Sequence, residues 1–294
     1  MRAWVSTVLT LALTAASSPI RATAAQTPQQ ATPPTAANPA MDAPRPIDAV
    51  DSVFIEELTW MEVRDAIRGG KKSVVVATGG IEQNGPYLTT GKHNYVLRAT
   101  TEAIARKLGN ALVAPIVPFV PEGGIEPPTS HMRYAGTISL QESTYAALLT
   151  DIVASLKQHG FEHIILIGDS GGNQRGMKQV ASELTTRWNG KPGVHFIPEF
   201  YDYPAATKYA EAEMGIKQGD EGIHDDYVIT SIIMTVDPNQ VRLKQREAKG
   251  KASINGVSIT PAARTIEHGH RLVSYRADQT VAAIKKALEA GSQK

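Results

Sequence analysis

Cysteine is absent from this chain of 294 residues. Its absence excludes disulfide bonds, a thiol nucleophile and every metal site built on thiolates. It also excludes a lipid-modified lipoprotein, because no cysteine follows the N-terminal segment. The folded part must therefore be stabilised by its core alone.

The chain also lacks an excess of either charge and a long apolar run. It has 30 Lys and Arg residues against 29 Asp and Glu, and no basic cluster stands out. Nucleic acid is therefore not an expected partner. The apolar stretch at residues 3–16 is interrupted by serine and threonine, whereas a membrane-spanning helix needs ~20 apolar residues. We expect no stable membrane insertion.

The N-terminal segment has the pattern of a secretory signal peptide. Arg2 precedes the apolar stretch, and small residues at 22–25 follow as a cleavage site. A signal peptide over residues 1–25 predicts an exported protein, periplasmic or secreted, and an anchoring helix is the alternative. Residues 26–46 are rich in Ala, Pro, Thr and Gln, which predicts a disordered linker. The folded domain is then expected over residues 47–294.

Strand-like and helix-like segments alternate through this domain. Short β-branched runs predict four buried strands, at residues 73–77, 111–117, 163–167 and 194–198. Amphipathic periodicity and glycine stops predict helices at 60–68, 94–108, 144–159 and 171–188, and another beginning near Thr230. Alternating elements of this length indicate an α/β fold with a mostly parallel sheet, covered by helices on both faces.

Four polar clusters carry the candidate functional residues. They are Glu82-Gln83-Asn84 with His93, the loop Gly168 to Asn173, the segment Gly222 to Tyr227, and Ser130 to Thr137 in a long Pro/Gly-rich loop. The first two follow predicted strands, and ligands bind at the carboxyl ends of strands in open α/β sheets. Carboxylates and imidazoles ligate Zn, Mn and Fe in hydrolases. The clusters therefore make a metal-binding hydrolytic site a candidate.

The segment Gly168-Asp169-Ser170-Gly171-Gly172 has a second interpretation. It matches the nucleophile motif of trypsin-like proteases, but its position between an apolar run and a helix does not fit their all-β fold. It also matches the Gly-x-Ser-x-Gly nucleophile elbow of α/β hydrolases. In that alternative the partners of Ser170 would be Asp225 or Asp237 and His268 or His270.

Together these motifs resemble those of the creatininase (creatinine amidohydrolase) family. Residues 80–88, Gly-Ile-Glu-Gln-Asn-Gly-Pro-Tyr-Leu, are similar to its Glu-Gln-His-Gly-Pro-His-Leu signature. Residues 168–173 resemble its Asn-Gly-His-Gly-Gly-Asn loop, and residues 133–140 and 224–231 resemble two further family segments. The resemblance implies a three-layer α/β/α sandwich, metal-assisted hydrolysis of an amide C–N bond in a small-molecule substrate, and a homo-oligomer, usually a hexamer.

Several positions that carry metal ligands in the family differ in this chain. The first-motif His of the family is Asn84 here, its Asp is His93, and its second-motif His is Ser170, whereas Glu82 is retained. We therefore expect a rebuilt site for one divalent metal (Zn, Mn or Fe). The expected metal ligands are Glu82, His93, Asp169 and His224.

The remaining polar residues receive roles in the same hypothesis. His224, Asp225 and Asp226 are the expected catalytic residues, with a carboxylate moving the proton to the leaving nitrogen. The expected substrate contacts are Asn84, Ser170, Gly171, Gly172 and Asn173. Two alternatives stay open: Asp169 as a simple helix cap, and a metal-free, catalytically inactive small-ligand-binding protein of the same fold.

Overall fold

The structure is a computed structural model that describes residues 40–292. The chain divides into two units, Met1–Pro44 and Arg45–Lys294. In the first unit only residues 40–44 are described, and there the Ala43 N–H donates to the Ala40 carbonyl at 2.9 Å. The predicted signal peptide at 1–25 and most of the predicted linker at 26–46 lie outside the described residues. Among the described helices, none is long and apolar enough to cross a membrane.

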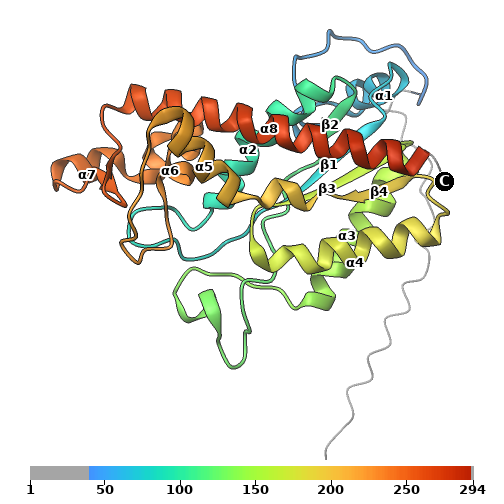
Figure 1. Ribbon diagram of the computed structural model, residues 1–294. Helices are drawn as coiled ribbons and strands as arrows, with labels where there is room; N and C mark the ends of the chain where they lie inside the picture. The colour runs from blue at the N-terminus through green and yellow to red at the C-terminus, as the bar shows by residue number, and fades with distance from the viewer. Residues whose placement is uncertain (1–39, 293–294) are drawn as a thin grey trace, which may run out of the picture. The chain divides into compact units, whose positions relative to one another are not determined.

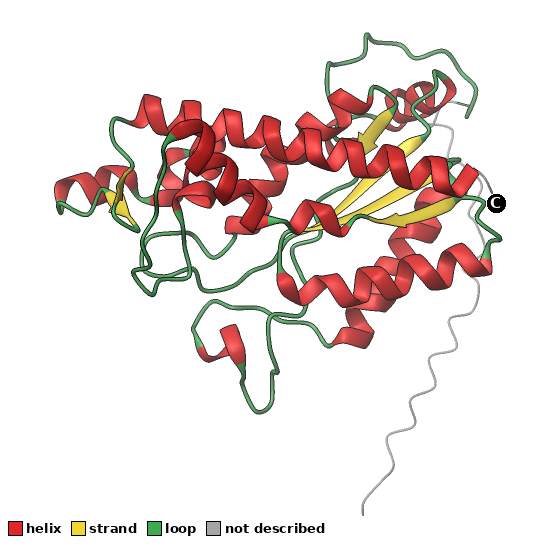
Figure 2. Cartoon of the chain, viewed as in Figure 1, coloured by secondary structure: helices red, strands yellow, loops and turns green. Residues whose placement is uncertain are grey.

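Four parallel strands form the sheet of the second unit, in the order β2-β1-β3-β4 (Figures 1 and 2). The strands are β1 Ser73–Thr78, β2 Ala111–Val113, β3 His163–Gly168 and β4 Gly193–Phe196. All four predicted strands are present. β2 is shorter than expected because Pro115 has no N–H to continue the ladder.

Helices cover both faces of this sheet. Successive side chains of a strand point to opposite faces, so Val74 and Val76 pack into one apolar cluster and Val75 and Ala77 into another. The first cluster contains residues of α1 Trp60–Arg68, α3 Glu142–Gln158 and α4 Gln174–Arg187. The second contains residues of α2 Lys92–Leu108 and α8 Ala262–Ser292. The expected three-layer α/β/α sandwich is confirmed.

A third apolar cluster lies beyond the carboxyl ends of the strands, on the left in Figure 1. It joins α2 and α8 to further elements. Of α8 and these elements, the sequence patterns predicted only α6. These elements are α5 Tyr203–Met214, α6 Tyr227–Val236, α7 Leu243–Ala248, and a small antiparallel ribbon of β5 Ser253–Ile254 and β6 Val257–Ser258. This part of the unit forms a wall beside the strand ends.

Helix α8 is held close to α6 by a glycine. A Cβ atom built on Gly269 would lie 2.1 Å from the Ser231 carbonyl oxygen, so no larger residue fits at the crossing. The close approach matters for the site, because α8 carries Arg276 two turns further along. The position of that arginine therefore depends on the α6–α8 contact.

We expect Gly269→Ala to destabilise the protein by about 1–3 kcal/mol, because the added methyl group overlaps backbone that cannot move freely. The loss should exceed the ~1 kcal/mol that alanine gains in helix propensity. Urea unfolding of the variant measures it. The control is Ser274→Ala on the exposed face of α8, which should stay within about 0.5 kcal/mol of the wild type. Equal stability of the two variants would contradict the close contact.

Candidate functional site

The candidate site lies where β1 and β3 end, side by side in the sheet. The chain leaves β1 toward β2 on one side and later returns to β3 on the other. Such a topological switch point is where ligands bind in open α/β folds. A cavity of about 550 Å³ opens there. The first two predicted polar clusters therefore meet at one place.

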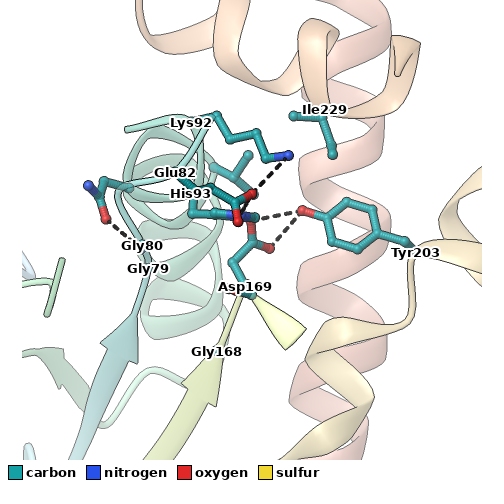
Figure 3. A network of polar contacts seen from close by, with 12 residues as sticks. Gly79, Gly80, Glu82, Lys92, His93, Gly168, Asp169, Tyr203 and Ile229 are labelled. Atoms are coloured by element: carbon teal, nitrogen blue, oxygen red, sulfur yellow. Dashed lines mark hydrogen bonds and ion pairs between the residues drawn. The ribbon is translucent and has the colours of Figure 1, made fainter. Parts of the chain in front are cut away.

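Glu82 is the centre of the site (Figure 3). Its side chain is 2% exposed. One oxygen, Oε1, accepts hydrogen bonds from His93 Nε2 at 2.8 Å and His224 Nε2 at 3.0 Å, and lies 3.4 Å from Lys92 Nζ. The other, Oε2, lies 3.3 Å from His131 Nε2. Burial opposes ionisation of Glu82, but the hydrogen bonds from His224 and His93 and the charges of His93 and Lys92 lower its pKa.

His93 joins two carboxylates. Its Nε2 meets Glu82 and its Nδ1 lies 2.8 Å from Asp169 Oδ2. Burial favours the neutral ring, but the hydrogen bonds to Asp169 and Glu82 outweigh it and raise the pKa of His93. Both ring nitrogens therefore donate to carboxylates, as an imidazolium does. In this arrangement neither nitrogen is free to bind a metal.

Asp169 is fully buried and holds His93 through Nδ1, the ring nitrogen that does not meet Glu82. It accepts hydrogen bonds from Arg276 Nη2 at 2.9 Å and from the Tyr203 hydroxyl at 2.8 Å. Burial opposes its ionisation, but the charge of Arg276 and the hydrogen bond from His93 lower the pKa of Asp169. Both of its oxygens are thus occupied by protein donors. Local sequence reasoning offered no signal for Arg276, which lies 107 residues away on α8.

Three of the described residues present donor atoms suited to a metal ion: Glu82, His131 and His224. One donor atom from each lies within 4.8 Å of the other two. A carboxylate and two imidazoles are the protein ligands of catalytic zinc sites such as the His₂Glu type. Burial lowers the pKa of His131, which keeps this ring neutral as a ligand must be. A divalent ion therefore fits this donor set.

His131 was not among the predicted ligands. It lies in a single turn of 3₁₀ helix, Ser130–Arg133, within the long loop between β2 and α3. Its ring stacks at a tilt on that of His224, with centroids 4.8 Å apart. Nδ1 of His131 is buried and has no hydrogen-bond partner among the described residues. The sequence signal available was the histidine in the fourth polar cluster, but nothing local indicated that the loop turns back onto β1.

Glu122 is a second residue that the sequence reasoning missed. Its Oε2 accepts a hydrogen bond from the Ser170 hydroxyl at 3.1 Å, whereas Oε1 is buried without a partner among the described residues. Burial and the nearby charge of Glu82 raise the pKa of Glu122 to about 8. Two carboxyl groups in one buried site cannot both ionise easily. Glu82 therefore holds the charge and Glu122 holds a proton at neutral pH.

The two adjacent aspartates at the start of α6 have different surroundings. Asp226 caps the helix by accepting the Ile229 N–H at 2.7 Å. Asp225 accepts the Thr230 hydroxyl with Oδ1 at 2.9 Å, and its Oδ2 has no partner among the described residues. Burial raises the pKa of Asp225 to about 7. Both residues line the cavity together with His224.

The predicted substrate contacts divide into two groups. Ser170, Gly171 and Gly172 line the cavity. The Asn84 amide instead donates to the Glu82 and Thr89 carbonyls within its own loop. Asn173 likewise donates to the Thr78 and Gly79 carbonyls and holds the ends of β1 and β3 together. Both asparagines thus shape the walls of the site.

The structure places Ser170 away from a serine-hydrolase triad. In the described part of the chain its hydroxyl donates to Glu122 and accepts from the Gly172 N–H at 3.3 Å, and no histidine is bonded to it. His268 is engaged elsewhere, with Nδ1 2.9 Å from the Tyr227 hydroxyl. Ser170, rather than Asp169, caps the turn that follows β3.

Comparison with known proteins gives a family match over most of the chain. Residues 56–284 match the model of the creatininase family, described as creatinine amidohydrolase. A creatinine amidohydrolase of Pseudomonas putida is 27% identical over 116 residues, covering 40% of this chain and 44% of the relative. A 3-dehydro-scyllo-inosose hydrolase of Thermotoga maritima is 22% identical over 186 residues, 63% of this chain and 57% of the relative. The chain thus spans about half the length of these relatives.

Solved creatininase structures share the fold. A mutant creatininase of Zn-Zn type aligns with TM-score 0.58 and 22% identity, covering 81% of this chain and 98% of its own. A structure described as creatininase Mn and a mutant creatininase complexed with creatine both align with TM-score 0.57 and 22% identity. Each covers 80% of this chain and 98% of its own. At this identity the likeness establishes the fold.

Removing Arg276 should leave the buried Asp169 without its guanidinium partner. We expect Arg276→Met to destabilise the protein by about 3–5 kcal/mol, the typical cost of breaking a buried ion pair from one side. Urea denaturation of the variant measures the free energy of unfolding. Lys285→Met on the exposed part of α8 is the control and should change it by less than about 0.5 kcal/mol. A loss no larger than that of the control would contradict the proposed anchoring.

Glu122 should make stability depend on pH in metal-free protein. Its pKa is about 8 in the folded state, against an ordinary value of 4.5. Between these values the unfolded chain has lost a proton that the folded protein keeps, so stability falls as pH rises. Glu122→Gln should flatten that slope, as measured by urea unfolding between pH 5 and 9 with a chelator present. Glu126→Gln, an exposed change in the same loop, should leave the slope as in the wild type.

Proposed function

The chain belongs to the creatininase family, and on that basis we propose that it is an exported amidohydrolase dependent on one divalent metal ion. The substrate is a small polar molecule, and the bond hydrolysed is an amide C–N bond. The observation that carries the proposal is the convergence of Glu82, His131 and His224, with donor atoms within 4.8 Å of one another. Export rests on the N-terminal sequence pattern alone.

The nature of the metal follows from the donor set and from the relatives. Two imidazoles and a carboxylate suit Zn, Mn or Fe. Related creatininases are described as Zn-Zn type and as Mn. When bound, such an ion supplies a Lewis acid for the carbonyl and a water of lowered pKa. Of the predicted ligands, Glu82 and His224 keep that role in this proposal, His131 joins them, and His93 with Asp169 becomes their support.

The protein's own residues orient the reacting groups and move the proton. His93, fixed by Asp169, holds Glu82 in position from the side opposite His224. Glu122 Oε1 and Asp225 Oδ2 are carboxyl oxygens without partners among the described residues, and both side chains line the cavity. Asp225, whose pKa is about 7, is placed to take a proton from the attacking water. Glu122, which holds a proton at neutral pH, is placed to give one to the leaving nitrogen. Asp226 uses Oδ1 to cap α6 and also lines the cavity.

The cavity limits the class of substrate. Its volume of about 550 Å³ suits a small molecule, and its lining of imidazoles, carboxyls and hydroxyls suits a polar one. The named substrates of the two relatives, creatinine and 3-dehydro-scyllo-inosose, are of this size and polarity. Of the two, only creatinine contains the amide C–N bond of the proposed reaction.

One observation favours a second candidate, the metal-free binding protein. Lys92 and His93 already place positive charge against Glu82, so the carboxylate is neutralised without an ion. In that case the pocket would bind a small polar ligand and show no turnover. The two candidates differ in their response to metal removal.

Chelation and His131→Ala together test the proposed function. Purified protein supplied with Zn or Mn should retain about one ion per chain and hydrolyse a member of a panel of small cyclic and linear amides. His131→Ala should lower metal affinity by more than the ~10–100-fold that loss of an outer-shell partner costs, with a parallel loss of turnover. Plasma mass spectrometry measures the metal. His159→Ala, at the exposed end of α3, is the matched control. Turnover that persists after complete chelation would contradict the proposal that the reaction depends on a metal ion.

A further inference from the structure

Lys92 occupies a position that fold stability alone does not favour. It is the first residue of α2, its side chain is 2% exposed, and no acidic residue lies in the first turn of the helix. A helix N-terminus carries partial positive charge, so a cation there is unfavourable. Lysine is also rarely buried unless it is paired. Here, among the described residues, the ammonium group is ion-paired only across the candidate site, with Glu82, and a local rule broken at such a site is typical of a functional residue.

The ammonium group of Lys92 points into the candidate site (Figure 3). Nζ lies 3.4 Å from Glu82 Oε1 and donates to the His224 carbonyl at 3.5 Å. Both distances are at the long end for such contacts, and an ammonium group has three hydrogens to donate. Lys92 therefore shares the carboxylate oxygen used by His93 and His224 and is only loosely held.

We propose that Lys92 is an internal cation that competes with the divalent metal ion for Glu82. The inference rests on the proposed function, because the ion in question is the one that Glu82, His131 and His224 would hold. An ion bound to Glu82 would stand within a few ångströms of the ammonium group, where two positive charges repel strongly in a poorly solvated site. Lys92 thus weakens metal binding and supplies positive charge beside Glu82 when the ion is absent.

A purely structural ion pair would behave differently. If Lys92 only neutralised Glu82, its removal would leave an unpaired buried carboxylate and destabilise the protein. If the ion binds away from the ammonium group, added metal would then bind no more tightly than before. Under competition, removal of the charge frees Glu82 for the ion, and metal binding restores the stability that was lost. Metal affinity therefore separates the two roles without any assay of turnover.

The experiment is calorimetric titration of chelator-treated full-length protein with Zn²⁺, repeated with Mn²⁺. Lys92→Met is expected to bind the ion at least about tenfold more tightly than the wild type, because the repulsion is removed. Lys92→Arg keeps the charge and should stay within about threefold of the wild type. Lys178→Met, an exposed change on α4, is the matched control and should show wild-type affinity. If Lys92→Met does not fold, Lys92→Gln takes its place.

The outcomes distinguish this inference from the proposed function. Equal or weaker metal binding by Lys92→Met, or binding by Lys92→Arg as tight as by Lys92→Met, would overturn the competition. A wild type that binds one ion and turns over substrate would in that case leave the proposed function intact. A wild type without metal, beside a Lys92→Met variant that binds one ion per chain, would support the competition and overturn the metal-dependent reaction.

Discussion

The negative charge of Glu82, held in a nearly dry site, is the constraint on which the rest of the structure depends. A buried carboxylate is costly unless its oxygens receive donors, and here four basic side chains from three separate segments surround it. Each of those segments must therefore be brought to the same point. The sheet, the long loop and the helical wall are arranged around that requirement.

The support of Glu82 extends outward through a chain of alternating charges. His93 lies between Glu82 and Asp169, and Asp169 in turn is held by Arg276. Negative and positive groups follow one another, so each charge is balanced by its neighbours in a region that water scarcely reaches. The last member comes from α8, whose place against α6 depends on the absence of a side chain at Gly269. The packing of α8 against α6 thus affects the orientation of the His93 ring, through Arg276 and Asp169.

Family membership identifies the fold of this chain, whereas the residues around Glu82 determine what the site can bind. The fold is that of the creatininase family, and by the resemblance Glu82 stands at the carboxylate of its signature. In this chain the carboxylate meets the imidazolium of His93 and the ammonium group of Lys92. By the resemblance, His93 stands where the family pattern has an aspartate. His131, from the loop before α3, adds an imidazole whose Nε2 meets Glu82 and whose Nδ1 has no hydrogen-bond partner among the described residues.

By itself the sequence determined the four strands, the helices between them and hence the α/β/α sandwich, because hydrophobic periodicity is a local signal. It also placed Glu82 and Asp169 after strands, and so near each other. Which groups pair was decided only by the tertiary structure. Both ring nitrogens of His93 are bonded to carboxylates. Arg276 and Glu122 come to the site from segments whose sequence has no motif that predicts a functional residue. Desolvation of charges depends on what packs around them, and that is a property of the whole fold.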